Sequence, residues 1–169
     1  MFDLHIPLDD LRVDSREPLF VDGRVWLTVD GREFPAARWS DAALSVLGSL
    51  GRAVAGALDG ETADFYFFEG SYFVRLTPLP PEPRAPRRVR VTAVDDGDTW
   101  AADAEGNAVP VAEGEVRAEV VVPLREVAER HGAALALVGG WAEARRENEV
   151  IRVLSRMYRY DAADPRFDH

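Results

Sequence analysis

The aromatic segment at residues 64–77 constrains the fold of this chain more than any other feature. Two β-prone runs flank a Glu-Gly-Ser sequence, an arrangement typical of a hairpin with a glycine-centred turn. Side chains alternate along a strand, so Phe65 and Phe67 point one way. Tyr66 and Phe68 then point the other way, and both faces are hydrophobic. The pattern predicts central strands that are covered on both sides.

The N-terminal third has the pattern of a β-meander. Asp22-Gly23 and Asp30-Gly31 separate short apolar runs, and Asp-Gly favours the positive φ angles of a type I′ turn. The run between the two pairs is therefore expected to pair with both of its neighbours in the sequence. The strands expected in this sheet are residues 2–6, 18–21, 24–29 and 32–34.

An amphipathic helix is predicted over residues 41–58, where apolar residues recur at spacings of three and four and Gly60 follows the end. The Ser40 hydroxyl is expected to cap the first turn, with Asp41 at the positive end of the helix dipole. Glycine is unfavourable inside a helix. At least one of three glycines is therefore expected to let the helix approach the sheet closely: Gly48, Gly51 or Gly56.

Two helical regions are predicted near the C-terminus. The first begins after Pro123, a residue tolerated in a first helical turn, and ends at His131, whose imidazole would lie at the negative end of the helix dipole. The second covers residues 133–158 and is expected to break at Gly139-Gly140 or at Asn148.

These elements predict an α+β fold built from antiparallel meanders. Five prolines within residues 78–86 indicate an extended connector between two halves, and residues 87–122 carry the turns of a second meander. We expect a single domain over residues 1–160, followed by a flexible tail at 161–169. The 41–58 helix would cover one face of the sheet and the C-terminal helices another.

The residue types exclude several kinds of chemistry. The chain has no cysteine, and all 20 of its basic residues other than histidine are arginine. A Walker A loop, a Schiff-base lysine, a thiol nucleophile, a disulfide and a cysteine metal site are therefore excluded. The three histidines lie far apart, and the acidic run at residues 95–98 lacks the spacing of an EF-hand loop. We expect no catalytic residue, no metal and no cofactor.

The charge distribution argues against nucleic acid, and it fits either a solvated acidic surface or a field that steers a basic protein partner. The formal net charge of −10 repels polyphosphate, whereas the segment at residues 95–119 holds many acids and a single cation, Arg117. No apolar run approaches the roughly 20 residues of a membrane span, and no secretory signal is visible. We expect a soluble cytoplasmic protein without membrane contact. The preference for Arg over Lys and for Val over Ile is typical of a high-GC bacterium.

Two sets of residues are candidate partner-binding surfaces. The first is the aromatic hairpin, whose residue types are typical of interface anchors: Tyr66, Phe68, Glu69, Phe73 and Arg75. The second is a stripe on the last helical region: Arg145, Arg152, Arg156 and Arg159. The alternative for the first set is core beneath the C-terminal helix. The alternative for the second is a solvated helix face with ion pairs to Glu149.

The order of elements over residues 19–94 resembles that of small uncharacterised proteins of high-GC bacteria, some of which are similar to immunity proteins of polymorphic toxin systems. The residues that carry this resemblance are Val25-Trp26-Leu27, Trp39-Ser40-Asp41 and Phe67-Phe68-Glu69-Gly70. The resemblance implies a protein that neutralises a toxin, such as a basic nuclease, by binding it. It assigns no functional residue.

The sequence thus favours a non-catalytic protein-binding module of immunity type. One alternative is a small hydrolase or ligand-binding enzyme in which Glu69 and Asp64 line a pocket beside Tyr66. Another is a self-assembling structural protein, in which the aromatic strands meet across a homodimer interface.

Overall fold

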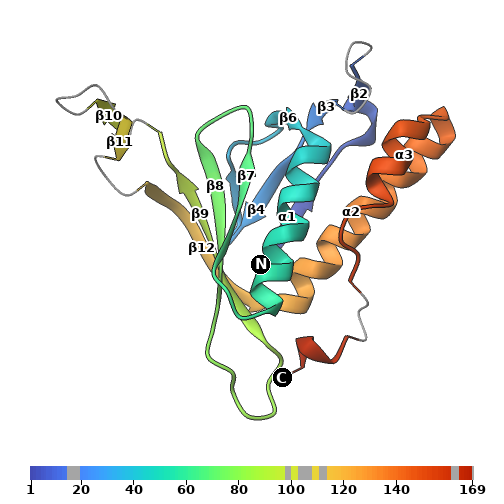
Figure 1. The fold of residues 1–169 in the computed structure, drawn as a ribbon. Helices are drawn as coiled ribbons and strands as arrows, with labels where there is room; N and C mark the ends of the chain where they lie inside the picture. The colour runs from blue at the N-terminus through green and yellow to red at the C-terminus, as the bar shows by residue number, and fades with distance from the viewer. Residues whose placement is uncertain (15–19, 98–99, 103–107, 111–113, 161–163, 169) are drawn as a thin grey trace.

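The computed structural model describes residues 1–14, 20–97, 100–102, 108–110, 114–160 and 164–168 (Figure 1). The strands are β1 (Phe2–His5), β2 (Arg12–Val13), β3 (Val21–Arg24), β4 (Trp26–Val29), β5 (Arg32–Phe34), β6 (Ser40–Ala42), β7 (Ala63–Phe67), β8 (Tyr72–Pro78), β9 (Arg88–Asp95), β10 (Trp100–Ala102), β11 (Ala108–Pro110) and β12 (Glu115–Pro123). The helices are α1 (Ala43–Leu58), α2 (Leu124–Arg145) and α3 (Asn148–Leu154), with short 3₁₀ helices η1 (Leu8–Asp10) and η2 (Pro165–Phe167).

Antiparallel sheets and helices together form an α+β fold, which confirms the predicted class. The main sheet has four strands in the order β12-β9-β8-β7. Two smaller sheets have the orders β1-β4-β5 and β2-β3-β6, and β10 pairs with β11. Figure 1 shows α1, α2 and α3 together on one side of the main sheet. The prediction that helices cover different faces of the sheet is therefore wrong.

The main core lies between the main sheet, the β1-β4-β5 sheet and the first two helices. Phe65 and Phe67 of β7, Phe34 of β5 and Leu50 of α1 belong to it and are almost fully buried. The rings of Phe34 and Phe67 meet edge to face, with centroids 5.8 Å apart. A second cluster joins α1 to α2 and α3. Burial of this apolar surface is the main term that favours folding.

Only one of the two Asp-Gly pairs forms a turn. Asp30 and Gly31 join β4 to β5 with φ angles of 49° and 78°, as predicted. Asp22 and Gly23 lie inside β3, where a Cβ on Gly23 would stand 2.6 Å from Cδ2 of Leu11. Only glycine fits at position 23 without displacing Leu11. The predicted turn at this pair is wrong. Consequently β4 pairs with β5 and β1 rather than with the preceding strand.

Helix α1 begins at Ala43, and the predicted cap at Ser40 is wrong because Ser40 belongs to β6. The fully buried Asp41 explains the difference. Its carboxylate accepts hydrogen bonds from Nε1 of Trp39 at 2.9 Å and from the backbone N–H groups of Phe68 and Glu69 at 3.0 and 3.2 Å. Asp41 therefore ties β6 to the end of β7 instead of facing the helix dipole.

Helix α1 covers the free edge of β7. Ser49 Oγ accepts a hydrogen bond from the backbone N–H of Tyr66 at 3.2 Å, which occupies a donor that the edge strand leaves unpaired. A Cβ on Gly56 would stand 3.1 Å from Cβ of Ala63 in β7. The prediction that a glycine permits close approach to the sheet is confirmed at this position.

The proline-rich segment does not divide the molecule into two halves. It connects β8 to β9, which are hydrogen-bonded neighbours in the main sheet. The backbone N–H of Leu79 donates to the Arg88 carbonyl at 3.0 Å, so pairing continues into the segment. Strands on both sides of the prolines share one core.

Helix α2 runs without interruption through Gly132 and Gly139-Gly140, so the predicted end at His131 is wrong. It ends where Arg146 adopts a left-handed conformation, and α3 begins at Asn148, one of the two predicted breaks. His131 is buried, and its Nε2–H donates to the Leu47 carbonyl at 3.0 Å. Burial lowers the pKa of His131, which is not a helix-terminal cation. Among the helices in the described ranges, none has the length and apolar character needed to cross a membrane.

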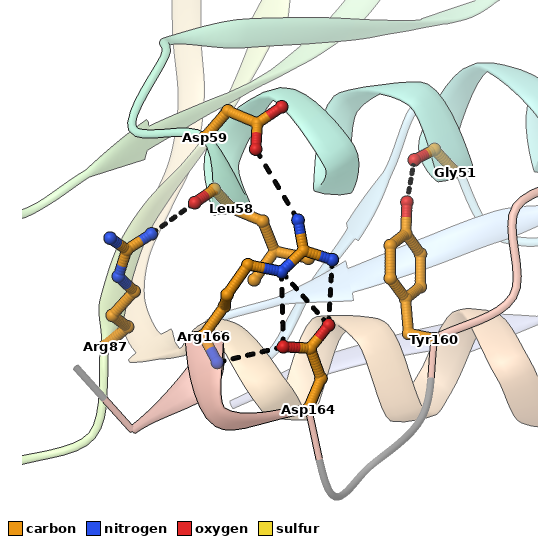
Figure 2. Close-up of polar contacts among 7 residues, drawn as sticks. All are labelled: Gly51, Leu58, Asp59, Arg87, Tyr160, Asp164 and Arg166. Carbon is orange, nitrogen blue, oxygen red and sulfur yellow. Dashed lines mark hydrogen bonds and ion pairs between the residues drawn. The ribbon is translucent and has the colours of Figure 1, made fainter.

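The C-terminal segment is anchored on α1 and its following turn (Figure 2). The Tyr160 hydroxyl donates to the Gly51 carbonyl, and burial raises the pKa of that hydroxyl. Arg166 pairs with Asp164 at 2.8 Å and with Asp59 at 3.6 Å. Phe167 is buried in the main core. The predicted flexible tail is therefore wrong for residues 164–168, and the rest of it lies outside the described residues.

Candidate functional site

The main sheet has one face against the core and one face, here termed the outer face, on which none of the described helices packs (Figure 1). The strand register places three rows of side chains across it. These rows are Tyr66-Phe73-Val94-Val116, Asp64-Arg75-Thr92-Glu119 and Thr77-Arg90-Val121. The outer face thus combines an apolar row with a charged row.

The aromatic hairpin is buried on its inner side and exposed to solvent on its outer side. Phe65 and Phe67 are buried, whereas Tyr66 is 49% exposed. The predicted central position is confirmed for β8 and wrong for β7, which is the last strand of the sheet. The predicted cover on both sides is wrong, because Tyr66 on the outer face is exposed. The polar residues Arg75 and Thr77 alternate with Val74 and Leu76 in β8, a pattern that fits a half-solvated antiparallel sheet.

Tyr66, Phe73 and Arg75 form one packed unit on the outer face. The rings of Tyr66 and Phe73 have centroids 6.1 Å apart. The Arg75 guanidinium lies 5.2 Å from the Phe73 ring centroid, within the range of a cation–π contact. It also binds Asp64 with two hydrogen bonds of 2.8 and 2.9 Å. This bidentate pair fixes the guanidinium in place over the ring.

The remaining charges of the outer face also compensate one another. Glu119 accepts a hydrogen bond from Thr92 at 3.0 Å and pairs with Arg90 at 3.5 Å. Two further apolar side chains stand beside them on β12: Val116 is 57% exposed and Val121 is 41% exposed. The face therefore presents rings and aliphatic groups among charges that already have partners.

The acidic segment at residues 95–119 begins where β9 of the outer face ends. Strands β9 and β12 extend into the β10-β11 hairpin, which Figure 1 shows at the end of the sheet away from the helices. Asp95 pairs with Arg117 at 2.6 Å, and Glu115 pairs with the same guanidinium at 3.0 Å. Among the described residues, no three His, Asp or Glu side chains are grouped as a metal site requires.

The structure separates Phe68 and Glu69 from the rest of the predicted hairpin set. Phe68 lines a groove between α1 and the segment after α3. Glu69 lines a cavity of about 600 Å³ together with Arg12 and Trp39. Asp64 is held by Arg75 on the outer face, so the structure does not bring Asp64 and Glu69 together as the enzyme alternative requires.

The four arginines of the second predicted set do not share one helix. Arg145 ends α2 and stacks on Trp141, with its guanidinium 5.1 Å from that ring centroid. Arg152 lies in α3 and pairs with Glu149 at 2.7 Å, as its structural alternative predicts. Arg156 and Arg159 follow the end of α3. The predicted single stripe is wrong.

Sequence reasoning missed Val94, Val116 and Val121, because their membership of one face follows from strand order and register. Simple alternation along β12 would group Val116 with Val120 and Val122, and only the register shift between Val116 and Ala118 places Val116 on the outer face. Comparison of the chain with protein-family models, with curated proteins and with solved structures gives no match.

Proposed function

We propose that this protein is a protein-binding module that docks a basic partner protein on the outer face of the main sheet. The observation that carries the proposal is the uncovered unit of Tyr66, Phe73 and Arg75, with Val116 and Val121 exposed beside it. Tyr and Arg are the residue types that most often dominate interface energies. Because Asp64 already holds the Arg75 guanidinium, docking does not leave that charge unpaired.

Charge complementarity supports a basic partner. The chain carries a formal net charge of −10, and its most acidic segment continues from strands that form the outer face. Such a field accelerates encounter with a cationic protein and weakens as salt screens it. A second copy of this chain would carry the same charge, and long-range repulsion disfavours that occupant.

The narrower form of the proposal is an immunity-type protein of the cytoplasm that neutralises a basic toxin. The resemblance of residues 19–94 to small proteins of high-GC bacteria favours this form. Binding through one rigid sheet face would suit inhibition, because a preformed surface loses little conformational entropy on docking.

Site-specific photo-crosslinking tests the proposal. A photoreactive residue replaces Val121 on the outer face, which is 41% exposed, or, as a control, Leu137 of α2, an aliphatic side chain on the helical side that is 55% exposed. We expect the Val121 position to capture one basic protein in cells of the source bacterium and the Leu137 position not to capture it. Tyr66→Ala in the crosslinking variant should reduce the adduct at least about tenfold.

Three outcomes would overturn this function. Capture of the chain by itself at Val121 would support the self-assembling alternative. Equal adducts at Val121 and Leu137, or an acidic partner, would show that the outer face is not the specific docking surface. The immunity-type form requires in addition that the captured protein be toxic when expressed alone and harmless when co-expressed with this chain.

A further inference from the structure

A groove on the helical side of the molecule joins one residue from each of the two predicted surfaces. It lies between α1 and the segment that follows α3, and its volume is about 460 Å³. The residues used below are Gly48, Arg52, Phe68, Arg156, Met157 and Tyr158, all of which line it. This volume is within the range of small-molecule sites, roughly 300–1,000 Å³.

The groove has a mixed lining that includes two half-exposed aromatic rings. Phe68 is 51% exposed and Tyr158 is 54% exposed. Gly48 lines the α1 side of the groove, where a Cβ would lie at ordinary van der Waals distance from Met157 Cε (3.7 Å) and Arg52 Nη1 (3.9 Å).

The charge in the groove is opposite to that of the whole chain. Arg52 and Arg156 line it, and none of the described Asp or Glu residues does. Within the part of the chain that the structure describes, neither guanidinium makes a hydrogen bond or an ion pair. Arg117 and Arg166 hold carboxylates of this chain, whereas Arg145 and Arg159, like the groove arginines, have no ion pair among the described residues. Two guanidinium groups that have no ion pair among the described residues lie beside exposed rings, and together they form a site for an anion with an aromatic body.

We propose that this groove binds a small aromatic carboxylic acid. The carboxylate meets Arg52 and Arg156, and the ring contacts Phe68 and Tyr158. A guanidinium matches a carboxylate in shape and charge, and an aromatic body gains from burial against rings. The site shares no residue with the unit of Tyr66, Phe73 and Arg75 on the outer face, so either proposal can fail without the other.

Fluorescence titration with anilinonaphthalene sulfonate, an aromatic anion, tests the proposal. The uncharged probe phenylnaphthylamine serves as its matched control. We expect one sulfonate probe per chain. Arg52→Gln and Arg156→Gln should each weaken its binding about tenfold, because each removes a charged hydrogen-bond donor. The same substitutions should change binding of the uncharged probe by less than about twofold.

Further variants locate the site. Gly48→Leu should block both probes by filling the groove, while circular dichroism verifies the fold. Arg159→Gln, which removes a nearby cation that does not line the groove, should leave the affinity within about twofold. Phenylacetate should displace the sulfonate probe at least about tenfold better than phenylacetamide, which has the same ring and no charge.

Four results would contradict the proposal. Unchanged probe affinity in both Arg52→Gln and Arg156→Gln would remove the two arginines from the site. An equal loss in Arg159→Gln would reduce the effect to general charge attraction. A loss in Val121→Ser would place the probe on the outer face, and equal displacement by phenylacetamide would exclude a carboxylate as the recognised group.

Discussion

Phe65 and Tyr66 are neighbours in β7, yet one is fully buried and the other is half exposed. The same contrast holds along the whole main sheet, where the inner face forms the core and the outer face has no described helix on it. Aromatic residues on the two faces look alike in the sequence. The difference teaches that an aromatic strand can fill the core with one side and leave a ring exposed on the other.

The largest expected effect is a difference in the free energy of unfolding between a variant of the inner face and a variant of the outer face. Phe65→Ala should lower the free energy of unfolding by about 3–5 kcal/mol, because it opens a cavity in the core. Tyr66→Ala, one residue along, should lower it by less than about 1 kcal/mol. Urea denaturation followed by circular dichroism measures both. Similar losses in the two variants would contradict the assignment of faces.

The buried carboxylate of Asp41 gives the next largest effect. Asp41→Ala should destabilise the protein by about 2–4 kcal/mol, since it leaves several N–H groups without their acceptor. Ser40→Ala is the control and should have an effect below about 0.5 kcal/mol, because Ser40 does not cap α1. A large loss in Ser40→Ala would restore the capping role that the sequence indicates.

The buried His131 should make the free energy of unfolding depend on pH. Burial lowers its pKa in the folded state below the ordinary value of 6.5, so the unfolded chain binds the proton more readily. The contribution of His131 to stability is therefore complete above about pH 6.5 and is lost as the pH falls below it. The slope can reach at most about 1.4 kcal/mol per pH unit for one proton. Denaturant titrations between pH 5 and about 8 should show this slope in the wild type.

The His131→Gln variant is the control for that experiment. It should be less stable at neutral pH and should lack most of the slope near pH 6, because the titrating imidazole is absent. An undiminished slope in this variant would assign the pH dependence to other groups.

The smallest expected effect concerns the outer face. A double-mutant cycle on Asp64 and Arg75 should give a coupling free energy of about 0.3–1 kcal/mol, as expected for an exposed pair. The same substitutions should weaken partner binding far more, since the pair positions the guanidinium over Phe73. A coupling above about 2 kcal/mol would mean that the pair is buried, contrary to an uncovered face.

Local patterns predicted the elements that depend on neighbours in the sequence. The glycine-centred hairpin, the turn at Asp30-Gly31 and the amphipathic α1 all form as expected. The predicted helix cap at Ser40 and the predicted turn at Asp22-Gly23 do not form. The tertiary contacts of Asp41 and of Leu11 override the local propensity at these positions.

The candidate site was predictable only in part for a related reason. The hairpin pattern identified Tyr66, Phe73 and Arg75, which adjacent strands of one hairpin bring together. Placing Val116 beside them requires the order of strands that are distant in the sequence. The groove with Arg52 and Arg156 requires the packing of α1 against the segment after α3, which no short-range pattern encodes.

Thiol labelling tests the contrast between the two faces most directly, because the chain has no cysteine of its own. Val121 and Val122 are adjacent in β12, the first exposed on the outer face and the second buried. Under native conditions we predict that iodoacetamide modifies Val121→Cys at close to the rate of a free thiol and Val122→Cys at least about a hundredfold more slowly. Equal rates, or slow labelling at both positions, would contradict an uncovered outer face.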